Sequence, residues 1–223
     1  MGYFRIFAIM LSSMQNIKNI IFDYGNVIFS LDFAKSQNAW KELGIDNAHD
    51  FYSHSVQDPV FTAFERGDID AIGFRKRIRE ITGKPGLTDR QIDHAWNSLL
   101  VGVPEGNHEL LLNLKPKYRT FLLSNINEIH FDYIMNYLKN SFGFEGNGLL
   151  FEKVYYSHLV GKRKPEAEIF EQVLTENNLN PAETLFFDDS PQHIETAKKL
   201  GINTYLITAP DSIQAFFKKE VKG

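Results

Sequence analysis

The residues of this chain that are best placed to do chemistry each follow a short apolar segment. Asp23 follows the first such segment, Ser124 and Asn125 follow the second, and Asp188 and Asp189 follow the third. Short apolar segments bounded by turn residues are typical of buried strands. In α/β proteins, ligands bind at the edge of the sheet where such strands end. We therefore expect these five side chains to gather at that edge.

A cation joins this set, because Lys164 directly precedes Pro165 and Glu166. Each feature alone has an ordinary structural interpretation: acids after strands cap helices, Ser-Asn forms turns, and basic loops are solvated. We favour the solvated loop for Lys162 and Arg163. The whole set, in the order carboxylate, hydroxyl, cation and paired carboxylates, is hard to explain as caps. Phosphoryl transfer to an aspartate needs a rigid carboxylate, neutralisation of charge and a metal. This set of side chains could supply the carboxylate and the positive charge and could bind the metal.

The order of these motifs resembles that of the haloacid dehalogenase superfamily of phosphotransferases, from about residue 17 to about residue 207. The most similar subgroup is the small sugar-phosphate phosphatases of the glucose-1-phosphate type. Their first motif reads Phe-Asp-x-Gly-Asn-Val, which stands here from Phe22 to Val27. The resemblance implies an α/β fold with a doubly wound, Rossmann-like parallel sheet and an all-helical cap inserted after the first motif.

The resemblance also implies a role for each residue of the site. Asp23 would be the nucleophile and would form an aspartyl-phosphate intermediate. Ser124 would donate its hydroxyl to a phosphate oxygen, and Asn125 would do the same or orient the substrate. Lys164 would neutralise the phosphate and hold Asp23 in place. We therefore expect Asp23, Ser124 and Lys164 to be catalytic.

A divalent cation is expected at this site, because a bare carboxylate would repel an anionic phosphate. Mg²⁺ prefers oxygen ligands and keeps several waters, so that few protein ligands suffice. We expect Asp23, the carbonyl of Gly25 and Asp189 to bind it, with Asp188 as a further ligand or as a residue that orients the others. The histidines of the chain show no metal-ligand spacing.

The chain departs from the superfamily pattern at Gly25. Most phosphatases of the superfamily carry a second aspartate there, which protonates the leaving oxygen and then activates water; the subgroup named above lacks it too. General acid–base catalysis is worth about 10²–10⁴-fold. We therefore expect slow turnover or a good leaving group, such as that of a sugar 1-phosphate, with the proton supplied by substrate, solvent or cap.

Strands alternate with helices along most of the chain, which predicts a parallel sheet with helices on both faces. We expect strands at residues 17–22, 118–123, 153–156, 184–187 and 203–207, and helices at 33–43, 70–82, 88–100, 104–114, 128–139, 165–176, 191–200 and 211–222. Thr88 and Gln91 fit a capping box, and Pro165 suits the first position of a helix. We find no convincing strand between residues 43 and 104. We therefore assign residues 17–34 and 104–223 to the α/β core and residues 35–103 to the helical cap.

A polar turn formed by Glu65, Arg66 and Gly67 stands out in the helical segment. The caps of similar proteins face the active site and bind the body of the substrate. Arg66 is therefore a candidate substrate contact, with an exposed turn between two helices as the alternative interpretation.

Composition limits the partners and the location of the protein. Of the 223 residues, 43% are hydrophobic and 23% are charged, as is typical of soluble globular proteins. The net charge is −4, and no basic stripe suggests nucleic-acid binding. Residues 1–16 fit a disordered extension or an over-called translation start, and their apolar part is too short to span a bilayer. No cysteine is present, as suits a reducing compartment. We expect a cytoplasmic monomer or homodimer that binds a small phosphorylated molecule, and no membrane.

Three other functions stay open. A 2-haloacid dehalogenase of the same superfamily needs no metal and usually lacks the paired acids. A phosphosugar mutase needs an acid/base, which Gly25 does not supply. A catalytically weak binding or regulatory domain belongs to a different class, and release of phosphate from a generic aryl phosphate would distinguish it from the enzymes.

Overall fold

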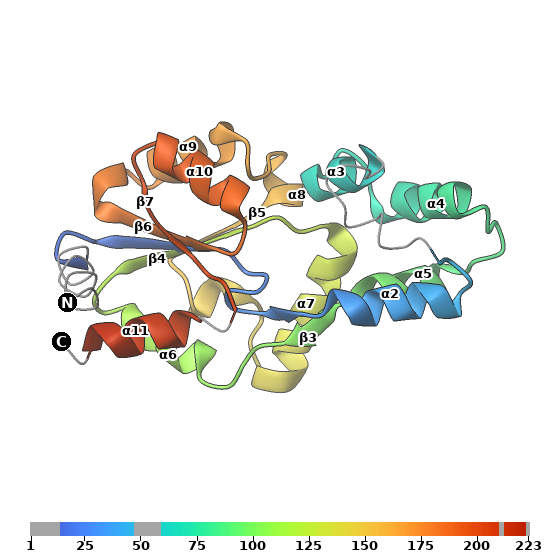
Figure 1. The fold of residues 1–223 in the computed structure, drawn as a ribbon, viewed down its shortest axis with the longest axis horizontal. Coiled ribbons are helices and arrows are strands. Elements are labelled where there is room, and N and C mark those ends of the chain that lie inside the picture. The colour runs from blue at the N-terminus through green and yellow to red at the C-terminus, as the bar shows by residue number, and fades with distance from the viewer. Residues whose placement is uncertain (1–13, 47–58, 210–211, 222–223) are drawn as a thin grey trace, which may run out of the picture.

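A parallel sheet of five strands forms the centre of the computed structural model, which describes residues 14–46, 59–209 and 212–221 (Figure 1). The strands lie in the order β5-β4-β1-β6-β7. Their bounds are Asn19–Phe22 for β1, Arg119–Ser124 for β4, Lys153–Tyr156 for β5, Thr184–Asp188 for β6 and Asn203–Leu206 for β7. The chain builds the sheet outward from β1 in both directions, which makes the carboxyl end of β1 the expected place for a ligand.

Both faces of the sheet are covered by helices, as the alternation along the chain predicts (Figure 1). The helices α9 (Ala167–Glu176) and α10 (Pro191–Lys199) cover one face, and α6 (Asn107–Leu114), α7 (Glu128–Phe142) and α11 (Ile213–Val221) cover the other. Successive residues of β1 serve the two faces in turn: Ile20 and Phe22 pack with the second group of helices, and Ile21 packs with the first. A strand buried on both faces is apolar along most of its length, and β1 is apolar after the buried Asn19, which explains why it shows no polar alternation.

Among the described residues between β1 and β4, four helices form a body with its own apolar core, which we name the helical insert (Figure 1). They are α2 (Phe33–Glu42), α3 (Pro59–Arg66), α4 (Ala71–Thr82) and α5 (Asp89–Asn97). Its core is aromatic: the rings of Phe64 and Phe74 stack with centroids 4.2 Å apart, and Trp96 packs against Phe74 at 5.1 Å. The capping box of Thr88 and Gln91 is present at the start of α5, as predicted.

The prediction that residues 43–104 hold no strand is wrong. β3 (Leu100–Gly102) pairs with β2 (Ser30–Leu31) in a small antiparallel ribbon. The helix expected to run to residue 100 ends at Asn97, because the next buried residues leave the helix and pair with the chain that follows the first motif. This ribbon joins the helical insert to the α/β core.

The prediction that Pro165 is the first residue of a helix is also wrong. α9 begins at Ala167, with Glu166 as its N-cap. The amide of Glu166 donates to the carbonyl of Arg163 at 3.0 Å, so Pro165 lies inside a turn, after a cis peptide bond. The helix expected from residue 104 likewise begins later, at Asn107.

The first segment of the chain is only partly described. Residues 1–13 lie outside the described residues, and with them most of the extension expected at residues 1–16. Met14 packs against the apolar core, and its carbonyl accepts a hydrogen bond from the amide of Ile17 at 3.1 Å. Among the described residues, no helix has the length and apolar character needed to cross a membrane.

Candidate active site

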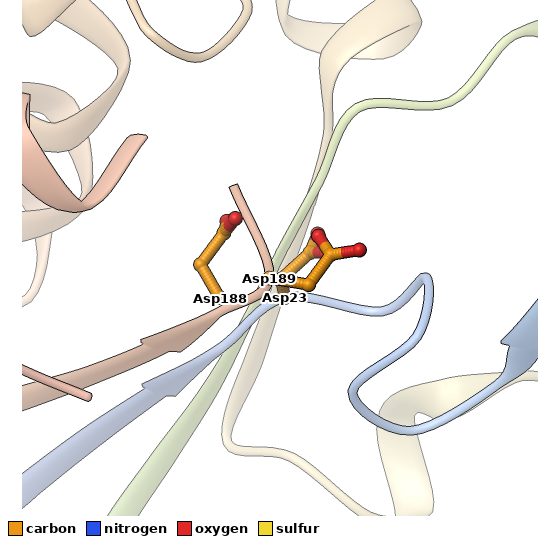
Figure 2. A group of neighbouring side chains, drawn as sticks. All are labelled: Asp23, Asp188 and Asp189. Atoms are coloured by element: carbon orange, nitrogen blue, oxygen red, sulfur yellow. The ribbon is translucent and has the colours of Figure 1, made fainter. Parts of the chain in front are cut away.

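The strand register brings the first and last acids of the sequence pattern together. β1 pairs with β6 so that Phe22 lies beside Phe187, and the next residues along the two strands are Asp23 and Asp188. The amide of Asp23 donates to the carbonyl of Phe187 at 2.8 Å, which extends the ladder to this point. Figure 2 shows Asp23, Asp188 and Asp189 leaving the ends of β1 and β6 on the same side of this edge.

Lys164 binds both strand-end acids. Its Nζ lies 2.6 Å from Oδ1 of Asp23 and 2.7 Å from Oδ2 of Asp188, and its side chain is fully buried. The backbone of Lys164 is held by Asn125, whose amide donates to the Lys164 carbonyl at 2.8 Å and accepts from the Lys164 N–H at 2.9 Å. Asn125 was expected to contact phosphate or substrate, and the structure shows both ends of its amide engaged with this loop instead. The cation is therefore fixed through its side chain and its backbone.

Burial and charge act differently on the three acids. Burial raises the pKa of Asp23 well above its ordinary value, although Lys164 acts in the opposite direction. Burial also raises the pKa of Asp189. The pKa of Asp188 is lowered, because Lys164 and His193 outweigh the effect of its burial. Burial alone would lower the pKa of Lys164, yet its two carboxylate partners raise it, so it stays a cation.

The three acids fit a divalent cation. One oxygen from each of Asp23, Asp188 and Asp189 can be chosen so that all three lie within 4.8 Å of one another. Lys164 alone leaves this group of carboxylates with an excess of negative charge, which a cation would balance. Asn26 orients the third acid, since its amide donates to Oδ2 of Asp189 at 2.9 Å. The backbone bridge between Gly25 and Phe29 uses the Tyr24 carbonyl and the Asn26 amide, so it does not engage the Gly25 carbonyl.

Besides Asn26, two further residues that orient the acids were not predicted from the sequence. The ring Nδ1 of His193 lies 2.9 Å from Oδ1 of Asp188, and the amide of Ser190 donates to the same oxygen at 2.7 Å. His193 lies in the first turn of α10, five residues after Asp188, and its place in the helix that follows the paired acids was the available signal in the sequence. Ser190 is the N-cap of α10 by position, but its side chain makes no capping hydrogen bond.

A cavity of about 170 Å³ lies between this edge of the sheet and the helical insert. The sheet contributes Gly25, Ser124 and Asn125 to its lining, and the insert contributes Glu65 and Trp96. Ser124 is the last residue of β4 and is buried, and it lines this cavity. Much of the remaining lining is apolar: Phe29, Leu31, Phe33, Leu99 and Ile134.

Arg66 lies at the contact between the insert and the sheet domain. Its Nη1 pairs with Oε1 of Glu166 at 2.8 Å, and its Nε lies 3.4 Å from Oδ2 of Asp68. The next residue of the pattern, Glu65, pairs with Arg163 at 2.8 Å. Arg163 is therefore mostly buried in an ion pair, and the solvated loop that was favoured for it is wrong.

The fold and the site define a hydrolase of the α/β class whose acids stand at the ends of neighbouring parallel strands. The chain belongs to the haloacid dehalogenase-like hydrolase family. The family model matches residues 98–207. A D-ribitol-5-phosphate phosphatase from Bacteroides thetaiotaomicron is 33% identical over 85% of this chain and 91% of its own length.

Two further relatives show the range of the similarity. The crystal structure of a haloacid dehalogenase family enzyme from Bacteroides thetaiotaomicron, in complex with magnesium and inorganic phosphate, superposes with a TM-score of 0.80. It is 38% identical and covers 90% of this chain and 99% of the other. A sesquiterpene phosphatase from Aspergillus oryzae is 27% identical over 83% of this chain and 87% of its own length.

Proposed function

We propose that this protein is a magnesium-dependent phosphatase that hydrolyses a small phosphorylated metabolite, a polyol or sugar phosphate, through an aspartyl-phosphate. The observation that carries this proposal is the buried Lys164, whose Nζ lies 2.6 Å from Asp23, beside the two further acids Asp188 and Asp189. A carboxylate fixed in this way is a nucleophile that needs no rearrangement before it reacts. The relatives support the proposal, because two of them are phosphatases and the solved enzyme holds magnesium and phosphate.

Asp23, Asp188, Asp189 and the carbonyl of Gly25 would hold the metal, and Asn26 and His193 would orient the acids. When bound, Mg²⁺ neutralises negative charge on the phosphate and on the carboxylates. Lys164, whose Nζ lies 2.6 Å from Oδ1 of Asp23, supplies a second positive charge, and the Ser124 hydroxyl would donate to a phosphate oxygen. These groups stabilise the transferring phosphoryl group without covalent chemistry of their own.

The reaction has two steps. A carboxylate oxygen of Asp23 attacks phosphorus, the bond from phosphorus to the leaving oxygen breaks, and that oxygen takes up a proton. Water then attacks the phosphorus of the aspartyl-phosphate, which releases inorganic phosphate and restores the Asp23 carboxylate. Residue 25 is glycine and carries no carboxylate, so the proton for the leaving oxygen would come from the substrate, from solvent or from the helical insert.

The cavity favours a short substrate. Its volume is about 170 Å³. Cavities that enclose drug-sized ligands measure about 300–1,000 Å³. The cavity therefore suits a chain of a few carbons, such as that of ribitol phosphate, better than a sesquiterpene. Glu65 provides a carboxylate among the apolar lining for a hydroxyl of such a chain. Both ring nitrogens of His130 are already engaged, by Asn127 and by the carbonyl of Trp96.

A panel of phosphorylated metabolites tests the proposal. We expect phosphate release to be fastest with pentitol and pentose phosphates, to require added Mg²⁺, and to stop after chelation. Slow release from farnesyl phosphate would agree with the size of the cavity. Activity that survives exhaustive chelation would contradict the metal role and favour a dehalogenase, and no release from any substrate, including an aryl phosphate, would favour a binding domain.

The covalent step has a separate test. Wild-type protein mixed with ³²P-labelled substrate and quenched in acid should carry the label on the chain, and hydroxylamine should remove it. The Asp23→Asn variant should carry none. Turnover of substrate without any labelled protein under rapid quench would contradict the intermediate and indicate direct attack by water.

A further inference from the structure

The loop that carries Lys164 is held from two sides. On the side of the sheet, the amide of Asn125 binds both backbone polar groups of Lys164. On the side of the helical insert, two adjacent residues at the end of α3 bind the residues that flank the Lys164–Pro165 dipeptide. Glu65 pairs with Arg163 at 2.8 Å, and Arg66 pairs with Glu166 at 2.8 Å.

The two ion pairs have opposite polarity. The insert contributes an acid and then a base, and the loop contributes a base and then an acid. Only one orientation of the insert satisfies both pairs, because a shift that exchanged partners would place like charges together. The exposed fractions of the four side chains lie between 15% and 34%, so water screens these pairs less than pairs on an open surface.

The backbone around these pairs is packed without spare room. Gly67 has a φ of +75°, and a Cβ built at this residue would lie 2.2 Å from the carbonyl oxygen of His158. The turn after α3 therefore lies directly on the segment that leads into the Lys164 loop. Nη2 of Arg66 also donates to the carbonyl of Gly161, at 3.4 Å, within the same segment.

We propose that Glu65 and Arg66 are positioning residues for Lys164, which make the placement of the catalytic cation depend on the docking of the helical insert. The turn from Arg163 to Glu166 is closed by a hydrogen bond of 3.0 Å between its ends, and Lys164 lies between them. A displacement of Arg163 or Glu166 would therefore move Nζ of Lys164 relative to Asp23. This inference rests on the proposed phosphatase function for its kinetic readout.

Charge reversal tests the proposal. Arg66→Glu should lower kcat by about ten- to a hundredfold, since a displacement of the order of 1 Å can cost this much, with a smaller change in KM. The double variant Arg66→Glu, Glu166→Arg should recover most of the loss. The second pair offers a repeat on the exchange of loop amides, in which the loss of protection in Glu65→Arg is restored by Arg163→Glu; kinetics are not compared for this pair because Glu65 also lines the cavity. Arg66→Lys should retain more activity than Arg66→Ala.

A matched control lies inside the insert. Arg75 on α4 pairs with Asp93 on α5 at 2.8 Å, with similar burial, but this pair does not touch the loop. Arg75→Ala should lower the melting temperature as Arg66→Ala does and leave kcat unchanged. Equal losses of kcat in the two variants would overturn the proposal, because they would reflect general stability. If Arg66→Glu raises only KM for polyol phosphates, and Glu166→Arg does not restore it, the proposal is also overturned and Arg66 is a substrate contact.

Hydrogen exchange gives a readout that needs no activity. Amides of residues 158–164 and 166 should exchange faster in Arg66→Glu than in wild type, and the double variant should restore their protection. Arg75→Ala should leave these amides unchanged. If the metabolite panel fails while this pattern holds, the phosphatase proposal is contradicted and the docking of the loop by the insert is supported; unchanged exchange in Arg66→Glu would overturn the docking itself.

Discussion

The side-chain amide of Asn26 donates a hydrogen bond of 2.9 Å to Oδ2 of Asp189. The carbonyl of the same side chain accepts from the backbone amide of Leu31 at 3.2 Å, so the Asn26 side chain is fixed at both ends. Asn26 also has a φ of 54°, in the left-handed region that asparagine tolerates better than most residues. One residue therefore shapes the loop after Asp23 and orients an acid that lies 163 positions away in the sequence.

Removing the Asn26 amide should weaken metal binding. Asn26→Gly keeps the positive φ and loses the hydrogen bond to Asp189. Loss of such an orienting partner typically costs about 10–100-fold in metal affinity or activity. We expect the Mg²⁺ concentration for half-maximal activity to rise by about this factor, as measured by magnesium titration of phosphate release. An unchanged titration curve would mean that Asp189 needs no help from Asn26 to bind the metal.

Replacing Asp23 should abolish turnover without loss of the fold. Asp23→Asn keeps the volume of the side chain and removes both the nucleophile and one of three converging negative charges. The melting temperature in metal-free buffer should not fall, because the repulsion between the acids is reduced while Lys164 keeps its partner Asp188. Phosphate release at a tenth of the wild-type rate or more would show that Asp23 is not the nucleophile.

Acid should destabilise the protein through His130. Its Nδ1 accepts from the amide of Asn127, its Nε2 donates to the carbonyl of Trp96, and its ring stacks on Trp96 at 5.0 Å. Burial disfavours the charged ring and lowers its pKa from 6.5 to about 4. The folded protein thus binds the proton less well than the unfolded chain, so this stability is present above pH 6.5 and is lost as the pH falls toward 4.

The size of this effect follows from the shift. At 1.36 kcal/mol for each pKa unit, the loss should be of the order of 1–3 kcal/mol. The free energy of unfolding from urea titrations at several pH values between 7.5 and 4 would measure it. His130→Gln stays neutral over this range and should show a shallower fall than wild type. Parallel curves for the two proteins would mean that His130 does not carry the acid sensitivity.

The central part of the fold could be predicted because its signals are local. The buried strand β1 is apolar from Ile20 to Phe22, and Asp23 follows it directly, so the edge of the sheet and its acid could be predicted together. β3 was missed because it has three residues and lies close behind α5, where buried residues continue the helical pattern. Its strand geometry depends on pairing with Ser30 and Leu31, about 70 residues away in the sequence, which no local pattern encodes.

The contacts that position the site could be predicted less well. Asp23, Lys164 and Asp188 were expected to gather, and they do. The partners of Arg66 were not foreseen, because Glu166 lies 100 positions away and pairing depends on how two bodies dock. The engagement of the Asn125 amide with the Lys164 backbone has the same origin, since a polar residue after a strand gives no sign of which loop will lie beside it.

Position 25 is where most phosphatases of the superfamily carry the acid that protonates the leaving group. Gly25 lines the cavity, and its φ lies outside the left-handed region, so its backbone would accept another residue. A Cβ at this position would instead lie 2.9 Å from Cδ1 of Leu31. The space for the missing acid is thus taken by a leucine side chain. Gly25→Asp alone should force Leu31 to move, and Gly25→Asp with Leu31→Ala should accommodate the carboxylate better.

The unmodified protein gives the cleaner test of the missing acid. Without a general acid, phosphates with acidic leaving groups should react well and simple alkyl phosphates poorly, because only the latter need protonation in the transition state. The gap in kcat/KM between them should be about 10²–10⁴-fold, the usual worth of general acid catalysis. A series of aryl and alkyl phosphates measures the dependence on leaving-group pKa. In the double variant the alkyl phosphates should gain selectively. If kcat/KM of the wild type does not depend on leaving-group pKa, and binding is shown not to limit the rate, another residue donates the proton. Glu65, a carboxylate of the helical insert that lines the cavity, would be the first residue to replace by glutamine.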